Sequence, residues 1–248
     1  MINAIYPGIS QGNKPDDYFL HRTILSPKND AVDNINQSIL DTFPGQQTTI
    51  TSIDKVINME NIYPVEFLHS LKASGLPLAH LTLKPGCPLM LLRNLDVANG
   101  LCNGTRMILL AIKPRVLQCR ILGGKHAGQV VFIPRITIEP SAEDMPIPLS
   151  RRQFPVRLAF SMTINKSQGQ SVTHVGLDLR VPVFSHGQLY VALSRCTSGN
   201  RIKVIFPQGS NSTSTTNIVY PELLNGILDP WYMFLHYCLQ LKLTSSFL

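Results

Sequence analysis

The segment best equipped for binding chemistry is the run Thr163-Ile164-Asn165-Lys166-Ser167-Gln168-Gly169-Gln170-Ser171. It directly follows an apolar run, residues 156–162, which we expect to form one buried strand. At the carboxyl end of a parallel strand, the hydroxyls, amides and single ammonium of this run can contact phosphate oxygens, and its glycine permits a close approach. A polar strand-to-helix turn without any ligand explains the same composition, so both interpretations stay open.

A second polar segment, residues 184–195, offers an amide and a guanidinium seven residues apart. Ser185 followed by Gln188 has the form of a capping box, so we expect a helix to begin at Ser185. Its buried stripe would comprise Leu189, Ala192 and Leu193. Gln188 and Arg195 are separated by two helical turns and therefore share a face. A planar guanidinium suits phosphate oxygens whose charge shifts during transfer, although Arg195 capping the helix C-terminus is the alternative.

The net charge of the chain is concentrated in one stretch. The 248 residues are 44% hydrophobic and 15% charged, with a formal net charge of +7. Residues 145–220 alone carry eight basic and one acidic side chain. A basic block inside an otherwise neutral chain predicts a polyanionic partner, either nucleic acid or nucleotide phosphate.

Cysteine usage and hydropathy bear on the cellular compartment. The five cysteines are odd in number and form no C-x-x-C pair, so the sequence supports neither a disulfide framework nor a zinc site. Free cysteines and the lack of a signal-like start favour a reducing, intracellular location. The apolar run 231–241 is about half a membrane span and predicts a packed or interfacial helix, so we expect no membrane partner.

Hydrophobic patterning divides the chain into three kinds of segment. Strand, loop and helix are expected over residues 22–40, and a short helix from about residue 63 ends at Gly75. Short runs separated by turns predict a small antiparallel barrel; these runs are 89–92, 106–112, 116–121 and 129–133. Further strands at 156–162, 175–179 and 202–206 alternate with helical segments, which is the pattern of a parallel sheet. Residues 209–217 read as a linker.

The amino-acid sequences of the two polar segments resemble motifs of a known family. From about Phe19 to Tyr220, the sequence resembles the C-terminal part of the PIF-type (petite integration frequency) DNA helicases, including the helicase part of Helitron transposons. Residues 157–171 look like motif V, and residues 187–195 look like motif VI. Shorter matches are residues 22–29 (the motif IV region), 89–95 (the entry to an inserted barrel) and 151–155 (its exit). Ser161 and Ser171 stand where Ala and Thr are expected.

The resemblance implies an α/β fold, namely the second RecA-like parallel-sheet domain of a P-loop NTPase motor with an inserted antiparallel β-barrel. The implied divisions are 1–83 and 151–208 for the RecA-like domain, 84–150 for the barrel, and 209–248 for a linker and divergent tail. It also implies a 5′-to-3′ DNA helicase that uses ATP and Mg²⁺, located in the nucleus or mitochondrion.

The resemblance assigns roles to eight residues. Those implied to lie against single-stranded DNA are Thr163, Asn165, Lys166 and Ser167. Gln168 and Gly169 would link that contact to the nucleotide. Gln188 and Arg195 would face the ATP phosphates, with Arg195 as the arginine finger. Five other basic residues near these motifs would supply a general positive field: Arg151, Arg152, Arg157, Arg201 and Lys203.

The sequence lacks two motifs that ATP hydrolysis requires. Gly8 to Lys14 fails the G-x-x-x-x-G-K-[ST] spacing, and no acidic pair follows an apolar strand to bind Mg²⁺. We therefore expect the chain to be inactive alone and to need a P-loop RecA-like domain in cis or in trans, so whether it is itself an enzyme stays open. The alternatives are a degenerate single-strand-binding protein and a peptide-binding protein. Phe132 is the only aromatic residue between residues 84 and 140, which disfavours a peptide groove in the barrel.

Overall fold

A computed structural model describes residues 1–248 except 13, 58–62, 142, 144, 208–213 and 221–248. Its Cα atoms form two compact units. Unit 1 comprises Met1–Ile9, His21–Ile39 and Phe160–Leu248, and unit 2 comprises Ser10–Leu20 and Leu40–Ala159. The predicted domain ranges differ from this division, because residues 10–20, 40–83 and 151–159 belong to the unit that contains the predicted barrel. The predicted tail helix, 231–241, lies outside the described residues.

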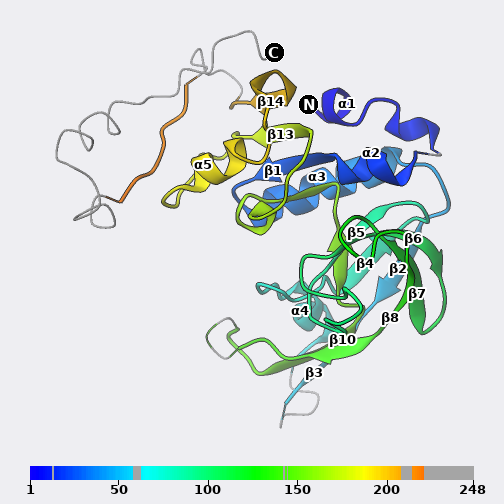
Figure 1. The fold of residues 1–248 in the computed structure, drawn as a ribbon. Helices are drawn as coiled ribbons and strands as arrows, with labels where there is room; N and C mark the ends of the chain where they lie inside the picture. Colours follow the sequence, from blue (N-terminus) through cyan, green and yellow to red (C-terminus); the bar gives the residue numbers. More distant parts are fainter. Residues whose placement is uncertain (13, 58–62, 142, 144, 208–213, 221–248) are drawn as a thin grey trace. The chain divides into compact units, whose positions relative to one another are not determined.

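Unit 1 is built on a four-stranded parallel sheet in the order β12-β1-β13-β14 (Figure 1). Its strands are β1 (Arg22–Ser26), β12 (Ser161–Thr163), β13 (His174–Asp178) and β14 (Ile202–Ile205). Its helical elements are α1 (Ile2–Ile5), η2 (Asn165–Ser167), α5 (Gln188–Leu193) and η3 (Gly199–Arg201). Both faces of β1 and β13 are almost entirely buried, as expected for strands inside a parallel sheet covered by helices.

Helix α3 (Asn29–Thr42) follows β1, as the pattern of residues 22–40 predicts. Within unit 1 its buried positions recur at helical spacing: Val32, Ile35, Asn36 and Ile39. Asn36 is the polar member of this stripe. Its side chain accepts a hydrogen bond from the Ser161 amide at 2.7 Å and donates one to the Ser161 carbonyl at 3.1 Å. The helix is thereby fastened to β12.

Unit 2 is dominated by antiparallel strands. A five-stranded sheet runs in the order β11-β5-β6-β7-β8, and two smaller sheets have the orders β3-β10-β9 and β2-β4. The large sheet contains β5 (Pro88–Leu91), β6 (Arg106–Ile112), β7 (Val116–Ile121), β8 (Val130–Pro134) and β11 (Val156–Leu158). The others are β2 (Thr48–Thr51), β3 (Ile53–Val56), β4 (His80–Leu83), β9 (Ile136–Ile138) and β10 (Leu149–Gln153). Alternating burial along β7 shows one face turned to the core.

The other helical elements are short. Of these, η1 (Ile9–Gln11) begins at the last residue of the first segment of unit 1, and α2 (Asp16–Leu20) and α4 (Val65–Ser70) belong to unit 2. The predicted helix ending at Gly75 is wrong in its end point, because α4 stops at Ser70 and Leu71 is extended. In the described parts of the chain, no helix is long and apolar enough to cross a membrane.

The single strand expected over residues 156–162 is also wrong. Residues 156–158 pair antiparallel with β5 in unit 2, whereas residues 161–163 pair parallel with β1 in unit 1. The run is mostly apolar because it enters two cores in succession, and hydrophobicity alone does not distinguish one long buried strand from two short ones.

Candidate nucleic-acid and nucleotide site

All eight predicted site residues lie in unit 1, around the carboxyl end of β12. Ser26, the last residue of β1, is opposite Thr163, the last residue of β12. The Ile164 amide then donates to the Ser26 carbonyl at 3.1 Å, which extends the pairing beyond the strand. The turn therefore begins at the edge of a parallel sheet, where open α/β sheets bind their ligands.

The turn presents some of its polar groups to solvent and buries others. Asn165 and Gln168 are exposed, whereas Thr163 and Ser167 are buried. The Ser167 hydroxyl donates to the Ile164 carbonyl at 2.6 Å and so closes the η2 turn. Of the four residues proposed for DNA contact, Thr163 and Ser167 are thus the less accessible.

Gly169 reverses the direction of the chain after η2. Its φ of +80° is rarely adopted by residues with a side chain, and no atom lies within 4 Å of where a Cβ would stand. The glycine is therefore required by the backbone conformation and not by crowding. The residue as a whole is exposed.

Gln188 lies at the start of α5, but the predicted capping box is wrong. The residue before the helix is Gly187 in the left-handed region, and no side chain caps the helix. The Gln188 Oε1 accepts instead from the Phe184 amide at 3.0 Å, one residue further back than a capping box requires. Its Nε2 lies 3.5 Å from Asn165 Oδ1, which brings the two polar segments together.

Arg195 lies beyond the end of α5, since the helix stops at Leu193. Its guanidinium is directed at backbone carbonyls. Nε donates to Val191 O at 2.9 Å, and Nη1 donates to Gln170 O at 3.1 Å and Ser167 O at 3.3 Å. The bond to Val191 is the helix C-terminal contact that the alternative interpretation predicts, and the other two reach the turn after β12.

Sequence reasoning missed one polar group at this sheet edge. The Ser26 hydroxyl is buried and has no hydrogen-bond partner among the described residues. Buried hydroxyls are usually satisfied, so an unsatisfied one next to the turn is a place where a ligand or water can bind. The pairing of Ser26 with Thr163 could not be foreseen, because the residues are 137 positions apart in the chain.

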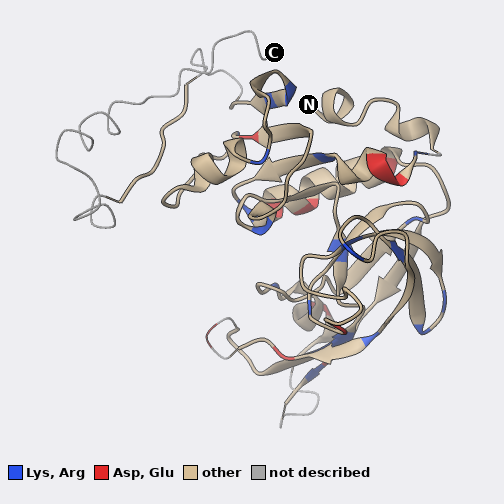
Figure 2. Ribbon diagram, viewed as in Figure 1, with Lys and Arg blue, Asp and Glu red and all other residues tan. Residues whose placement is uncertain are grey.

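The basic residues are distributed over both units (Figure 2), and one of them does not fit its predicted role. Arg151 is 1% exposed, and its guanidinium binds both carboxylate oxygens of Asp54, with a shortest distance of 2.6 Å. It also donates to three backbone carbonyls, those of Leu68, Leu71 and Pro77. A buried arginine neutralised by a carboxylate contributes almost no field outside the protein, so its assignment as a source of positive field is wrong.

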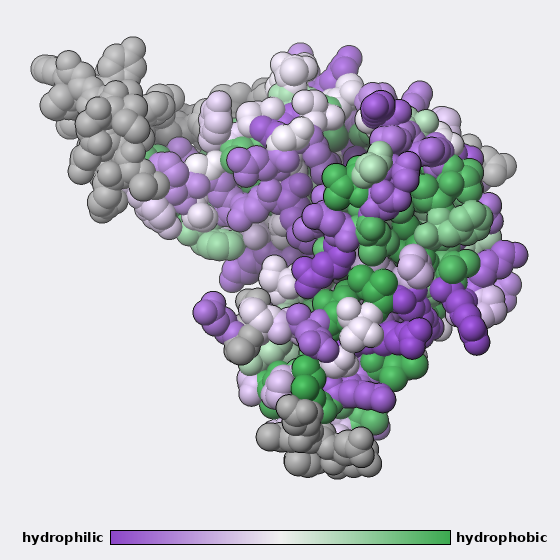
Figure 3. Space-filling model, turned by 60° about the horizontal axis from the view of Figure 1, so that its bottom comes forward, coloured by the Kyte–Doolittle hydropathy of each residue, from purple (hydrophilic) through white to green (hydrophobic). Residues whose placement is uncertain are grey.

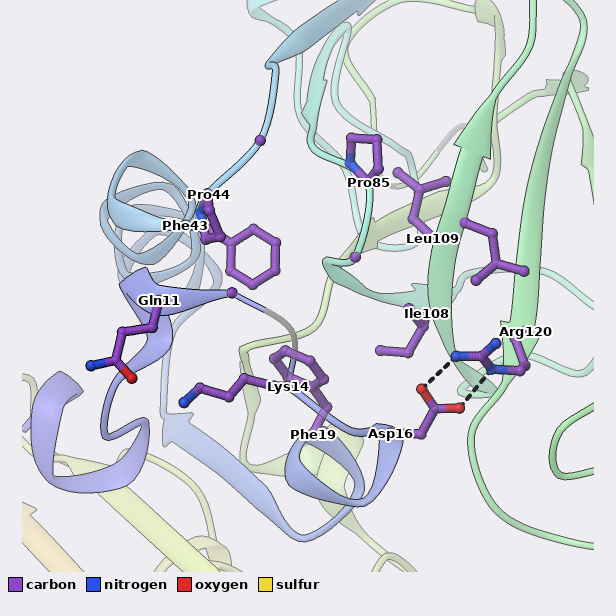
Figure 4. A pocket seen from close by; sticks show the side chains of 14 residues that line it. Gln11, Lys14, Asp16, Phe19, Phe43, Pro44, Pro85, Ile108, Leu109 and Arg120 are labelled. Atoms are coloured by element: carbon purple, nitrogen blue, oxygen red, sulfur yellow. Dashed lines mark hydrogen bonds and ion pairs between the residues drawn. The ribbon is translucent and has the colours of Figure 1, made fainter.

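Unit 2 contains a separate pocket of about 460 Å³ (Figure 4). Hydrophobic side chains, among them Phe19, Phe43 and Ile108, form part of its wall, and Lys14 lies at its edge. Asp16 and Arg120 line it as a bidentate pair with oxygen–nitrogen distances of 2.6 and 2.8 Å, and this pairing raises the pKa of Arg120. None of the eight predicted site residues contributes to this pocket.

Comparisons with known proteins show which proteins this chain is similar to. The family description of the 2B domain of DNA helicase Pif1 matches residues 66–112. The ATP-dependent DNA helicase PIF1 of Homo sapiens is 38% identical over 128 residues, which are 50% of this chain and 19% of that protein. The Rattus norvegicus protein is 34% identical over 189 residues, 74% of this chain and 27% of that protein. This chain belongs to the Pif1-type helicase family.

Solved structures of Pif1 helicases share the fold. One, from a study of DNA unwinding at forked double-stranded DNA by two coordinating Pif1 helicases, aligns with a TM-score of 0.60 and 26% identity, over 86% of this chain and 43% of its own. Pif1 of Candida albicans aligns with a TM-score of 0.56 and 27% identity, over 78% of this chain and 50% of its own. The RecA-like fold and the Pif1 family are thus confirmed, and this chain spans half or less of each of these relatives.

Proposed function

We propose that this chain is the second motor domain of an ATP-dependent, 5′-to-3′ Pif1-type DNA helicase. In this proposal the turn after β12 binds single-stranded DNA through Thr163, Asn165, Lys166 and Ser167. Gln168 and Gly169 connect that contact to the nucleotide. Gln188 and Arg195 face the phosphates of ATP, with Arg195 as the arginine finger.

One observation carries the proposal: the two polar segments meet at the carboxyl edge of the parallel sheet. Asn165 and Gln188 are 23 positions apart in the chain, and their amide groups lie 3.5 Å apart. Arg195 reaches the same turn from the other end of α5. A site in which DNA-contacting and phosphate-contacting groups touch each other is what coupling between the two ligands requires.

The residues present fit part of a nucleotide site. The donors of Gln188 and Arg195 suit phosphate oxygens, and ATP would supply the phosphoryl group whose transfer drives movement along DNA. In the described ranges no three His, Cys, Asp or Glu side chains are grouped so as to hold a metal ion. Asp178, at the carboxyl end of β13, is paired with Arg180 at 2.7 Å. We therefore propose that Mg²⁺ and the β- and γ-phosphates are held chiefly by a P-loop domain in cis or in trans.

The DNA arm of the proposal is tested with the whole chain and a fluorescent oligothymidine. Lys166→Gln should weaken binding and reduce the slope of log affinity against log salt by about 1, because one phosphate contact is lost. Arg201→Gln is the matched control: this exposed arginine directly precedes β14, at the opposite, amino edge of the parallel sheet. Equal effects of the two substitutions would mean that only general charge matters and would contradict a specific contact at the turn.

The nucleotide arm is tested by complementation. The chain alone should show no DNA-stimulated ATPase activity, and adding a Pif1 P-loop domain in trans should produce activity that Arg195→Ala removes. Activity of the pure chain that depends on Arg195 would contradict the need for a second domain. DNA binding without any complementation would favour a single-strand-binding protein that has lost motor function.

A further inference from the structure

The Arg195 side chain joins two segments of backbone through three carbonyl groups. Its guanidinium donates to the carbonyls of Val191 in α5 and of Ser167 and Gln170 in the turn. A fourth bond at 2.9 Å connects Nη2 to the Ser194 hydroxyl. Among the described residues, the hydrogen-bond partners of this guanidinium are three carbonyls and one hydroxyl, which are all neutral dipoles.

Apart from Arg195, the long-range bonds of the turn include Ile164 N–H to Ser26 O at 3.1 Å and Gln188 Nε2 to Asn165 Oδ1 at 3.5 Å. Its exposed residues are Asn165, Gln168, Gly169 and Ser171. Its internal bonds are short-range, such as Ser167 N–H to Ile164 O and Gln170 N–H to Ser167 O. A segment with few buried side chains opens easily unless long-range contacts hold it. Arg195, 25 and 28 positions away from its two carbonyl partners, supplies such contacts.

We infer that Arg195 is a positioning residue for the turn after β12: its guanidinium holds the Ser167 and Gln170 carbonyls, and with them the turn that faces DNA in the proposed function. Only the DNA part of this inference rests on that proposal. The positioning itself concerns contacts within unit 1.

The positioning role requires arginine in particular. A guanidinium presents five N–H groups in a rigid plane and can therefore bridge carbonyls from two segments at once. A lysine ammonium keeps the charge, but it is a compact group on a flexible stem and cannot reproduce the same span. The Arg195 carbonyl also accepts from the Val172 amide at 3.0 Å, and this backbone bond is retained whatever the side chain.

The same N–H groups cannot hold two carbonyls and a phosphate at the same time. A phosphate that takes the Nη1 group of Arg195 must therefore release the Ser167 and Gln170 carbonyls. By linkage, a ligand that stabilises the held form of the turn must weaken phosphate binding by Arg195 by the same factor. The two turn carbonyls and a phosphate thus compete for the same Nη1 group of Arg195.

The first experiment needs no ligand. Amide hydrogen exchange of the whole chain should be at least about tenfold faster in Arg195→Lys at Ser167, Gln168 and Gln170, if the bonds lost are each worth about 1.5 kcal/mol or more. Exchange in β13 and in unit 2 should be unchanged. Arg201→Lys is the control and should alter none of these amides. Unchanged exchange in the turn of Arg195→Lys would overturn the inference.

The second experiment measures oligothymidine binding with the same variants. A positioning role predicts that Arg195→Lys weakens binding about as much as Arg195→Gln, while the salt slope stays that of the wild type, since no phosphate contact is lost. Full affinity in Arg195→Lys together with a reduced slope in Arg195→Gln would mean that the charge acts directly on DNA, and would overturn the inference. If the wild-type chain does not bind DNA but the exchange result holds, the proposed function fails and the positioning role stands.

Discussion

Arg151 and Arg195 are both arginines of the basic block, yet the structure uses them differently. Arg151 is buried against the Asp54 carboxylate, whereas Arg195 donates to three carbonyls and is bonded to one hydroxyl. A charge neutralised by a carboxylate is costly to disturb and of no use to a distant ligand. A charge held by neutral dipoles keeps its attraction for phosphate. The basic block therefore contains at least two kinds of residue that sequence composition counts as one.

The buried pair makes the first prediction. Arg151→Met leaves Asp54 as a buried charge without its partner, so the free energy of unfolding should fall by roughly 3–5 kcal/mol. Urea denaturation followed by circular dichroism measures the change. Arg152→Met is the matched control, because its neighbouring side chain is exposed and its removal should change stability by about 0.5 kcal/mol or less. Similar losses in the two variants would contradict the assigned role of the pair.

The environment of His174 predicts that the stability of the chain depends on pH. Burial lowers the pKa of His174 below its ordinary value of 6.5, and the nearby charges of Arg22 and Arg201 lower it further. Protonation therefore favours the unfolded chain. The stability that neutral His174 contributes is complete above pH 6.5 and is lost as the pH falls through the folded-state pKa.

The measurement is urea unfolding between pH 7.5 and pH 5. The wild-type chain should lose stability on acidification, and His174→Gln should lose less, because it has no proton to bind at this position. An identical pH dependence in the two proteins would show that other histidines are responsible.

At the scale of elements, strands bounded by clear turn residues could be predicted, and the ends of helices could not. The strands at 106–112 and 116–121 were predicted at their observed bounds, because turn residues mark both ends of each run. The start of α5 was not, since Gln188 bonds to Phe184 and the chain enters the helix through left-handed Gly187. A motif specifies residue types, but it does not specify which of two neighbouring backbone amides donates a hydrogen bond to the side chain.

The site shows the same limit. The resemblance gathered all eight residues in one domain, which the structure agrees with, but it did not foresee that Arg195 contacts the turn. That contact depends on where α5 ends, and helix ends are set by local hydrogen bonds more than by apolar periodicity. The small sheet β3-β10-β9 was also missed, because β3 is largely exposed and the buried positions of β10 include the polar residues Arg151 and Gln153.

The close packing around Gly176 predicts the effect of a substitution on stability. It lies in β13, under helix α1, and a Cβ there would stand 2.9 Å from Ile5 Cγ1 and 3.1 Å from Ile24 Cγ1. Gly176→Ala should therefore destabilise the chain by about 1–3 kcal/mol through overpacking. Adding Ile5→Ala removes the closest atom, so the double variant should lose less stability than the sum of the two single variants, measured by urea unfolding. Simple additivity would contradict the clash.

At the scale of the whole molecule, the described chain has two compact units, and each contains fully buried hydrophobic side chains, such as Leu25 in unit 1 and Leu109 in unit 2. Unit 1 is built on a parallel sheet and unit 2 on antiparallel sheets. On the face drawn in Figure 3, hydrophilic residues predominate and hydrophobic side chains lie in scattered groups. The larger exposed hydrophobic side chains come from both units and include Phe132, Phe184 and Tyr190. Each unit thus holds its own core.

Because each unit has buried residues of its own, we expect a substitution in one unit to accelerate amide exchange mainly in that unit. Arg151→Met should accelerate amide exchange in β3, β9 and β10 and leave β1 and β13 unchanged. Gly176→Ala should do the reverse. Exchange measured by mass spectrometry on peptides from each unit distinguishes the two patterns. If either substitution accelerates exchange across both units equally, the chain unfolds as one cooperative body, and the two units are not independent in stability.

The division of residues 156–163 between two sheets has a consequence for how this family can vary in length. Only Ala159 and Phe160 separate the strand that pairs with β5 from the strand that pairs with β1. Inserting or deleting one residue there would shift one strand by one position and turn its inward side chains to the opposite face. The turns at Lys113-Pro114 and Gly123-Gly124 each connect two strands of the same sheet. Natural insertions and engineered tags should be tolerated at those hairpins and rejected between residues 156 and 163.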